Sequence, residues 1–543
     1  MMLRRRRHLI GREGLRQWVC VIVGIFWADY YTFQTRGRVH CLGILTKASA
    51  IKISCLPFPM NNRFPARFRT LLQWVLSFSL VSSVSADHGE SGDDLAQTPP
   101  LGWNSFDSYG VYLHEKAAFA NLEAMAEKLA PHGYEYFVID NGWFGEYRLQ
   151  EGTHYPAEKH ASDIRINEYG YFLPSTVYFP NGLDGLISRS KELGLKFGVH
   201  LMRGIPRKAY EMDLPIEGTP YTARDIADTD PAENCSWCTY NYAVDMRRPG
   251  AQEWYDGLIQ HIANMGVEMI KYDDIVEHPD EVEAVAKAIE KTGKPILLSL
   301  SPGNRVDPEA IEFFKLAHML RVTQDVWDEQ KYIDACFDAW RKWGGKEQPG
   351  FWIDMDMIPF GQLQLMSPPG TNSQGSPFSK GDIALAGKGV NRWCQLSRPQ
   401  METFISMRAL AASPLMMGGD LPTLDGFSLK LITDPDMLAC NQNGVMGTLV
   451  HEAEEQETWL VYERGSHQSG WLGIFNRAGS GAVVELKKTV LGLNDPAGLR
   501  LFDIWNDRVL EPGDTVEIPP NGVLFVRFQP ISSQSLTAVP SGE

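Results

Sequence analysis

The chain has 543 residues and a formal net charge of −16, with 44% of its residues hydrophobic and 22% charged. This length is too great for one ordinary domain and suits a barrel with an accessory module. The residues before Asp87 carry 13 Lys and Arg against 2 acids, whereas the remainder carries 38 against 65. We expect no nucleic-acid partner and no anionic membrane partner, because neither surface would attract the acidic remainder. A neutral substrate fits this charge better.

A transport signal is predicted near the end of the basic segment. Arg67 and Arg69 precede the apolar run 71–84, and small residues then follow up to Ala86, as a signal peptidase requires. We therefore expect 1–86 to be an N-terminal extension and signal peptide. The mature protein is expected to be secreted or periplasmic, without stable membrane insertion.

Met60 stands just ahead of this signal, which indicates that residues 1–59 come from an overextended gene start. The alternative is a membrane anchor at the apolar run 19–27. That run is far shorter than the roughly 20 residues of a spanning helix.

Between about Thr98 and Asn443, short apolar runs alternate with longer amphipathic stretches, which is typical of β-α units around a parallel sheet. Eight runs are predicted to be strands: Leu101–Ser105, Tyr134–Asp140, Lys196–Met202, Val267–Asp273, Pro295–Ser301, His318–Gln324, Phe351–Met357 and Pro414–Gly418. Eight strands close a (β/α)8 barrel. We therefore predict an α/β fold with a TIM barrel as the catalytic domain, residues 87–443.

Helices are predicted in the intervening stretches, for example at Lys116–Leu129, Leu183–Leu193 and Pro279–Thr292. A glycine follows each of the last two, which is a common helix stop. The connection from Gly204 to about Asp245 is much longer. Loops of such length are commonly functional, so we expect it to overhang the mouth of the barrel.

After Asn443 the pattern changes to alternating runs bounded by turn residues, such as 459–462, 471–475 and 523–528. This pattern predicts a C-terminal antiparallel β-sandwich domain, residues 444–530. Residues 531–543 are rich in Ser and Pro and are expected to form a loose tail.

Five cysteines follow Ala86, and Cys235 and Cys238 form the only close pair. In an exported protein such a pair is expected to form a local disulfide, since a redox role would need a thioredoxin-like context. No second Cys or His pair has the spacing of metal ligands, so no metal is expected. Organic cofactors are not implied either.

Two predicted strands each deliver a cation and then an aspartate to the same end of the barrel. Lys271 precedes Asp273 in one, and Arg321 precedes Asp325 in the other. Catalytic groups of (β/α)8 enzymes occupy the carboxyl ends of the strands, and two carboxylates are the minimum equipment for cleaving a glycosidic bond. Other strand ends carry groups that suit a sugar's hydroxyls and apolar face: Trp103, Asp140, Asn141, His200, Ser301 and Asp356.

Several ordered motifs resemble the glycoside hydrolase family 27 α-galactosidases. They are Thr98–Ser105, Ile139–Trp143, Lys271–Asp273, Arg321–Asp325 and Asp354–Met357, with Phe502–Trp505 similar to the family's C-terminal domain. The resemblance implies that Asp273 is the nucleophile and Asp325 the general acid and base of a retaining mechanism. It also implies that Lys271 and Arg321 contact the sugar.

The resemblance further implies that Asp140 holds the hydroxyls on the C4 and C6 side of galactose, and Asp356 falls where the family's second Asp-Met aspartate lies. Asn141 departs from the family's second aspartate, and His200 replaces its tyrosine. Ser301 belongs to a segment that replaces the family's Cys-Glu-Trp, which leaves room near C2. Ile275 replaces the cysteine that usually follows the nucleophile.

We therefore expect an exo-glycosidase for terminal α-D-galactosides, acting on an oligosaccharide or polysaccharide. β-L-Arabinopyranosides, α-N-acetylgalactosaminides and isomaltose-type glucans are alternative substrates for the same chemistry. A catalytically inactive carbohydrate-binding protein is the alternative from another class. The sequence leaves the oligomeric state open.

Overall fold

The computed structural model describes residues 95–366 and 390–531. The predicted signal peptide, the expected gene-start extension, the alternative anchor at 19–27 and residues 532–543 of the predicted tail lie outside the described residues. Within the two described ranges, no helix has both the length and the apolar character needed to cross a membrane.

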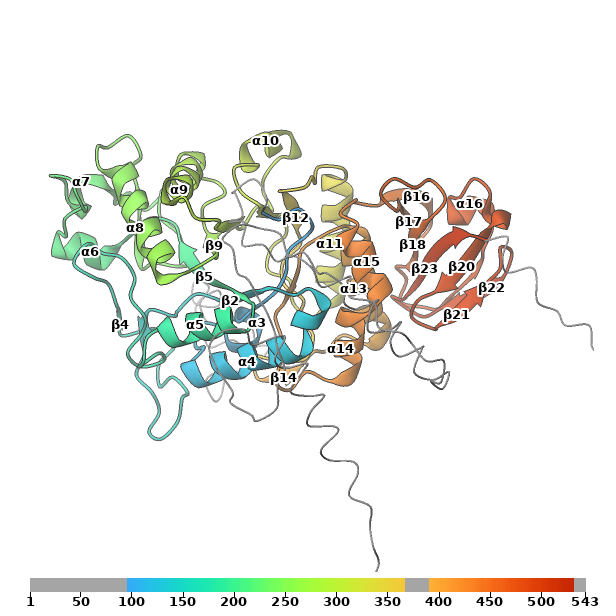
Figure 1. Cartoon of the computed structure of the whole chain (residues 1–543), viewed down its shortest axis with the longest axis horizontal. Helices are drawn as coiled ribbons and strands as arrows, with labels where there is room; N and C mark the ends of the chain where they lie inside the picture. The colour runs from blue at the N-terminus through green and yellow to red at the C-terminus, as the bar shows by residue number, and fades with distance from the viewer. Residues whose placement is uncertain (1–94, 367–389, 532–543) are drawn as a thin grey trace, which may run out of the picture. The chain divides into compact units, whose positions relative to one another are not determined.

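Eight parallel strands form the barrel (Figure 1). In spatial order they are β1 (Leu101–Asn104), β2 (Tyr136–Ile139), β5 (Lys196–Met202), β9 (Met269–Asp273), β10 (Leu297–Leu300), β11 (Met319–Arg321), β12 (Trp352–Asp354) and β15 (Leu415–Met417). A parallel bridge between Ile358 and Met417 connects the last two segments and closes the ring. Each predicted strand is present, so the (β/α)8 prediction is confirmed.

Most barrel strands are apolar on both faces, as expected for a parallel sheet enclosed by helices. All four residues of β2, for example, are buried. The helices of the barrel region are α3 (Phe106–Tyr109), α4 (Glu115–Lys128), α5 (Asp184–Glu192), α8 (Ala251–Met265), α9 (Pro279–Thr292), α10 (Ile311–Phe314), α11 (Gln330–Trp343), α13 (Arg398–Leu410), α14 (Gly426–Thr433) and α15 (Pro435–Gln442).

The three predicted helices are confirmed within one residue at each end. α9 shows why its limits were predictable. Pro279 occupies the first turn, where its missing N–H costs no hydrogen bond, and Gly293 takes the left-handed conformation, with φ 64°, that ends the helix.

The long connection after β5 has secondary structure of its own. It contains β6 (Ile205–Pro206), α6 (Arg207–Met212), α7 (Ala223–Ile226), β7 (Ala227–Asp228) and β8 (Asn241–Val244), and the strands pair in the order β6-β8-β7. Residues 231–237, between β7 and β8, line the main cavity. The connection therefore contributes to the barrel mouth, as the sequence predicted.

The C-terminal strands are antiparallel. A six-stranded sheet has the order β16-β17-β18-β23-β20-β21, and β19 pairs with β22 in a second sheet. The strands are β16 (Thr448–Ala453), β17 (Gln456–Tyr462), β18 (Gly470–Asn476), β19 (Ala482–Glu485), β20 (Leu499–Asp503), β21 (Arg508–Leu510), β22 (Thr515–Ile518) and β23 (Val523–Pro530). The predicted antiparallel fold is confirmed. Sequence analysis missed β16 because this largely exposed edge strand has no apolar run.

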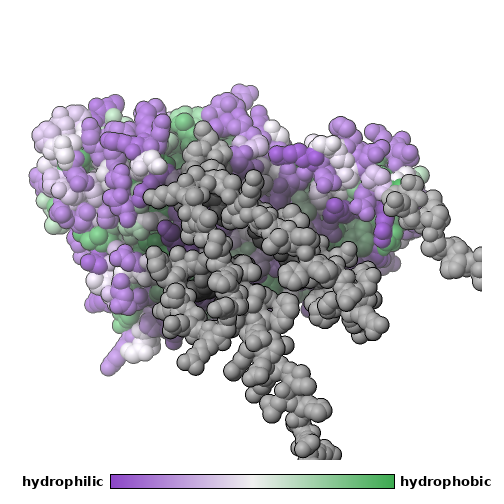
Figure 2. Space-filling view, in the orientation of Figure 1, coloured by the Kyte–Doolittle hydropathy of each residue, from purple (hydrophilic) through white to green (hydrophobic). Residues whose placement is uncertain are grey.

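The largest apolar cluster fills the barrel and its helix layer and includes residues of β17, β18 and β23. Trp340 of α11 stacks on Trp459 of β17 with ring centroids 3.8 Å apart. On the face shown in Figure 2, hydrophilic residues cover most of the described surface and hydrophobic ones form scattered patches.

Candidate active site

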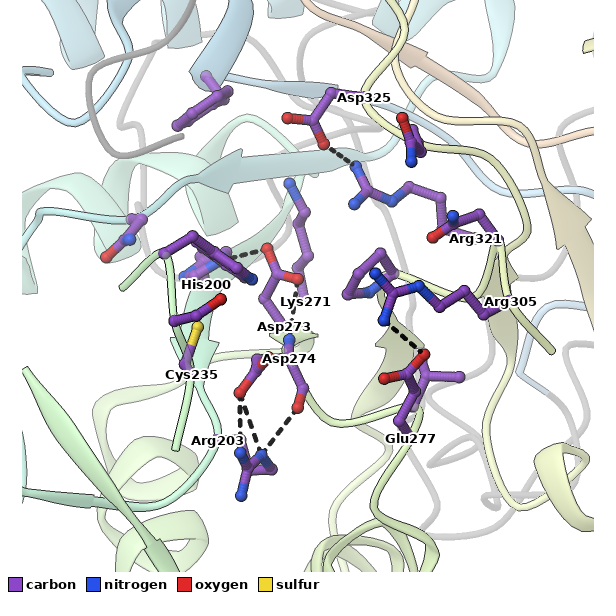
Figure 3. Close-up of a pocket in the computed structure, with 18 of the residues that line it drawn as sticks. His200, Arg203, Cys235, Lys271, Asp273, Asp274, Glu277, Arg305, Arg321 and Asp325 are labelled. Carbon is purple, nitrogen blue, oxygen red and sulfur yellow. Dashed lines mark hydrogen bonds and ion pairs between the residues drawn. The ribbon is translucent and has the colours of Figure 1, made fainter. Parts of the chain in front are cut away.

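A cavity of about 850 Å³ opens at the carboxyl ends of the barrel strands, within the size range of ligand sites (Figure 3). Its walls include these predicted site residues: Asp140, Asn141, His200, Cys235, Lys271, Asp273, Arg321 and Asp325. The two aspartates predicted for catalysis therefore face one cavity, at one end of the barrel.

Asp273 is the last residue of β9 and is 9% exposed. Its Oδ2 lies 3.3 Å from His200 Nε2, and its Oδ1 accepts a hydrogen bond of 2.9 Å from the backbone N–H of Asp274. Burial raises the pKa of the Asp273 carboxyl, but the hydrogen bond with His200 and the charge of Arg321 outweigh burial. The net effect holds the pKa below its usual range, so Asp273 is a carboxylate.

Lys271 lies on the same face of β9 as Asp273, because side chains two residues apart in a strand share a face. Its Nζ donates to Asp140 Oδ2 at 2.8 Å, and Asn104 Nδ2 donates to the same oxygen at 2.8 Å. Burial lowers the pKa of Lys271, but Asp140 and Asp273 reverse the shift and raise it. Lys271 is therefore a fixed cation that pairs with Asp140 and acts on Asp273 through its charge.

Asp325 follows β11, and its side chain is 48% exposed. Arg321 Nη1 donates to Asp325 Oδ1 at 2.7 Å and lies 3.3 Å from Asp356 Oδ1. Asp356 also accepts a hydrogen bond of 2.7 Å from the backbone N–H of Val326. The structure places Asp356 behind Arg321, where it holds the arginine and the loop that carries Asp325.

Asn141 lines the cavity, and its side-chain amide contacts residues that lie outside the lining. Tyr240 donates its hydroxyl to Asn141 Oδ1 at 3.0 Å, and Asn141 Nδ2 lies 4.0 Å from Cys238 Sγ. Ser301 is buried next to a cis peptide bond with Pro302, which lines the cavity in its place. The Ser301 hydroxyl has no hydrogen-bond partner within the described residues.

The prediction that Trp103 binds substrate is contradicted by its position. Trp103 is fully buried, its Nε1 donates to Gly419 O at 2.8 Å, and its ring stacks on Phe137 at 4.8 Å. Side chains alternate along a strand, so Trp103 faces away when its neighbour Asn104 faces Asp140. Trp143 and Trp352 are also buried and lie outside the cavity lining.

The expected disulfide between Cys235 and Cys238 is contradicted as well, because both cysteines are free thiols. Their side chains have separate partners. Cys235 interacts with the Asp274 carboxylate, whereas Cys238 lies against Asn141 and Tyr240. Burial raises the pKa of both thiols.

Sequence analysis missed several lining residues. Phe106 lies below Lys271, whose Nζ is 5.8 Å from the ring centroid, and Trp237 and Trp327 supply further aromatic surface. Asp107 also lines the cavity, and burial together with nearby Asp356 raises the pKa of its carboxyl. Phe106 and Asp107 directly follow the Trp103–Ser105 motif, and that adjacency was the available signal.

The cluster of carboxylates raises the question of a metal. Among residues 95–366 and 390–531, no group of three or more His, Cys, Asp or Glu side chains has the arrangement needed to hold an ion. The cavity carboxylates face Lys271, Arg321 and His200 instead.

No family model matches the chain. The alpha-galactosidase of Cyamopsis tetragonoloba is 23% identical over 420 residues, which cover 76% of this chain and 80% of the relative. The solved GH27 β-L-arabinopyranosidase of Geobacillus stearothermophilus is 32% identical with a TM-score of 0.71, over 83% of this chain and 99% of the relative. A structure from Bacillus halodurans, provisionally named alpha-N-acetylgalactosaminidase, is 30% identical with a TM-score of 0.67. The match covers 81% of this chain and 100% of that chain.

These similarities extend over the barrel and the C-terminal strands, and they agree with a cavity that presents two aspartates beside fixed cations. The chain therefore belongs to glycoside hydrolase family 27 and is a glycoside hydrolase.

Proposed function

We propose that the protein is a retaining exo-glycosidase that hydrolyses terminal α-D-galactosides through a covalent glycosyl intermediate on Asp273. The observation that carries the proposal is the contrast between two carboxylates on one cavity. Asp273 is buried, with its pKa held low, and Asp325 is half-exposed beside Arg321. A nucleophile must be ionised, and an acid and base must exchange protons with the leaving group and with water.

In the first step Asp273 attacks the anomeric carbon while the bond from that carbon to the leaving oxygen breaks. Asp325 gives its proton to that oxygen. In the second step Asp325 takes a proton from water, whose oxygen attacks the anomeric carbon and releases the Asp273 carboxylate. Two inversions retain the configuration.

Sugar hydroxyls would be held by Lys271, Arg321, Asp140 and Asn141, which line the cavity. Asp140 is a suitable acceptor because Lys271 and Asn104 already fix one of its oxygens. Burial raises the pKa of Asp140, but Lys271 and His200 outweigh burial and lower it, so it stays ionised. The proposed roles of His200, Ser301 and Asp356 are indirect. His200 shapes the site around Asp273, Ser301 around Pro302, and Asp356 around Arg321.

A β-L-arabinopyranoside is the second candidate substrate. It shares the ring stereochemistry of galactose but has no C6 group, and the similar Geobacillus protein is a β-L-arabinopyranosidase. Asn141 favours this alternative, because its amide is already held by Tyr240 and supplies no carboxylate for a C6 hydroxyl. α-N-Acetylgalactosaminides and isomaltose-type glucans are further alternatives.

A panel of nitrophenyl glycosides separates these substrates. We expect the α-D-galactoside to be cleaved with α-galactose as the first product seen by NMR. Faster cleavage of the β-L-arabinopyranoside would make it the preferred substrate, and release of the β anomer of galactose would contradict retention. Tight sugar binding without cleavage of any glycoside would favour the inactive binding protein.

We also propose that the enzyme is exported after cleavage near Ala86 and that its domains divide near residue 443. Sequencing the N-terminus of the protein recovered from culture medium or periplasm tests the export. Limited proteolysis tests the domain division.

A further inference from the structure

Arg203 lines the cavity and connects three separate segments, and Figure 3 shows its contacts with one of them, Asp274. Arg203 follows β5 and is 4% exposed. Its guanidinium donates to the carbonyl and carboxylate of Asp274 at 2.8 to 3.1 Å, to Glu281 Oε1 at 2.8 Å and to the carbonyl of Glu233 at 2.7 Å. Asp274 follows the predicted nucleophile, Glu281 lies on α9, and Glu233 belongs to the cavity wall 231–237.

The first connection reaches the Asp273 carboxylate through the backbone. Asp274 has a left-handed conformation, with φ 57°, which is uncommon for a residue other than glycine. The N–H of the same residue donates to Asp273 Oδ1 at 2.9 Å. The Arg203 guanidinium donates to the carbonyl and to the carboxylate of Asp274. The backbone N–H of Arg203 donates to Asp273 O at 3.1 Å. Arg203 therefore holds the residue whose N–H contacts the Asp273 carboxylate.

The second connection reaches the outer wall of the cavity. Besides the bond from Arg203 to the Glu233 carbonyl, Asn234 Oδ1 accepts from the backbone of Ala243, and Asn241 Nδ2 donates to Arg203 O at 2.9 Å. Residues 231–237 include Trp237 and lie on the same cavity as both aspartates. The wall is therefore tied to the strand end that carries Asp273 although no disulfide joins them.

We propose that Arg203 is a positioning residue that holds the Asp273 carboxylate and the 231–237 wall in one reactive geometry, and that this wall contacts the leaving-group sugar. The inference rests on the proposed role of Asp273 as nucleophile. A planar guanidinium suits the task because its fixed N–H donors reach several acceptors at once, whereas a lysine ammonium is a compact point charge.

A purely structural role of Arg203 can be distinguished by the turnover of the folded variants. Arg203 is paired with two carboxylates, so its loss leaves buried charges unpaired and destabilises the fold in either case. Only a positioning role lowers turnover by enzyme that has folded. A displacement of about 1 Å can cost on the order of 100-fold in rate.

The test compares Arg203→Met and Arg203→Lys with Glu281→Gln, in the full chain. Glu281→Gln removes one charged partner of Arg203 but leaves its contacts with Asp274 and Glu233, and Glu281 does not line the cavity. Folding is checked by near-UV circular dichroism and thermal melting. Kinetic constants are measured on the nitrophenyl glycoside that the unaltered enzyme cleaves best and on a disaccharide with the same terminal sugar.

We expect both Arg203 variants to lose about 10- to 100-fold in kcat on the nitrophenyl glycoside. We also expect a larger loss of kcat/KM on the disaccharide, because its leaving sugar needs the wall. Glu281→Gln should melt earlier and keep kcat within about threefold. If Arg203→Met does not fold, Arg203→Lys, which keeps the charge, carries the test.

A folded Arg203 variant whose kcat on the nitrophenyl glycoside stays within threefold of the unaltered enzyme would overturn the role at Asp273. Equal losses on the two substrates would overturn the role of the wall. Failure of the proposed function would appear elsewhere: the unaltered enzyme would cleave no glycoside, or Asp273→Asn would keep its turnover.

Discussion

The barrel mouth and the C-terminal sheet bury very different side chains. Around the cavity, Asp140, Asp273 and Asp356 are buried beside Lys271 and Arg321. In the C-terminal apolar cluster, every buried member is aliphatic except Phe528. Burying a charge is unfavourable unless it is paired, so we expect the mouth to be less stable than the aliphatic cluster wherever a buried carboxylate is not fully paired.

Backbone conformation does not divide the two regions, because Glu454, Asp507 and Asn521 in the C-terminal region also have positive φ angles, of 53°, 49° and 51°. Asp274 and Asp356, both next to barrel strands at the mouth, have positive φ angles of 57° and 74°. For residues other than glycine such conformations cost on the order of 1 kcal/mol or more. At the mouth, these two residues contact Asp273 and Arg321. Substitutions at the mouth should therefore change turnover, whereas substitutions in the sheet should change stability alone.

The largest expected effect is that of Asp273→Asn. Without a nucleophilic carboxylate, no glycosyl intermediate can form, so kcat should fall by about 10⁴-fold or more. Steady-state assays on a nitrophenyl glycoside measure this loss. In Asp273→Gly, added azide should restore turnover by attacking the anomeric carbon from the vacated space.

A loss of less than tenfold in Asp273→Asn would contradict the nucleophile assignment. The matched control is Asp328→Asn. Asp328 is also buried and pairs with Arg392 at 2.6 Å, but it lies outside the cavity lining. Its turnover should stay within tenfold of the unaltered enzyme.

The next effect is that of Asp325→Asn, and its size should depend on the leaving group. General acid catalysis contributes about 10²- to 10⁴-fold when the leaving oxygen needs a proton. The variant should therefore cleave a disaccharide more slowly by this factor in the first step. Cleavage of a dinitrophenyl glycoside should slow much less. Equal losses of kcat/KM on both substrates would exclude Asp325 as the acid.

The fold was predictable because every barrel strand except β15 is a short, largely apolar run that ends at a polar residue or just before one. The predicted and observed ranges differ mainly at the ends, as at His318–Gln324 against β11. There the backbone leaves the ladder after Arg321, which still pairs with Asp354, and Asp325 lies beyond the strand. Pairing partners across the barrel, rather than local sequence, decide where a strand ends.

The site was predictable only in part, because sequence reveals that a residue ends a strand but not which way its side chain points. Asn104 and Trp103 are adjacent, and only Asn104 bonds to Asp140. Similarly, the spacing of Cys235 and Cys238 suggested a disulfide, but both are free thiols that contact Asp274 and Asn141 respectively. The pairing of Asp274 with Arg203 could not be predicted, because it is a long-range contact that no local sequence pattern encodes.

Within the C-terminal sheet, Leu472→Ala should reduce stability without altering the chemistry. Leu472 is fully buried in the aliphatic cluster on β18. Removing its side chain leaves a cavity and should cost about 2 to 5 kcal/mol in the free energy of unfolding, measured with urea. Val483→Ala, at an exposed position, is the control and should cost under about 0.5 kcal/mol. A changed KM in folded Leu472→Ala would break the proposed division between the two regions.

The smallest effect should be a gain in stability at the mouth, from Asp354→Asn. Burial and the nearby Asp356 raise the pKa of Asp354 to about 6. Its pKa in the unfolded chain is about 3.9, so between these pH values the folded protein keeps a proton that the unfolded chain loses. Rising pH therefore destabilises the unaltered protein in this window, by about 3 kcal/mol in total.

Asparagine does not ionise and can still accept the backbone hydrogen bond that Asp356 N–H donates to Asp354 Oδ1 at 2.8 Å. The variant should thus match the unaltered protein below pH 4 and exceed it by up to about 3 kcal/mol above pH 6, as measured by urea unfolding at both pH values. Asp495→Asn, at an exposed position, controls for the lost charge. If Asp354→Asn instead lowered stability at pH 7, the carboxylate would be a net stabilising partner of Arg321 and Arg408, and the mouth would not be the less stable region at this position.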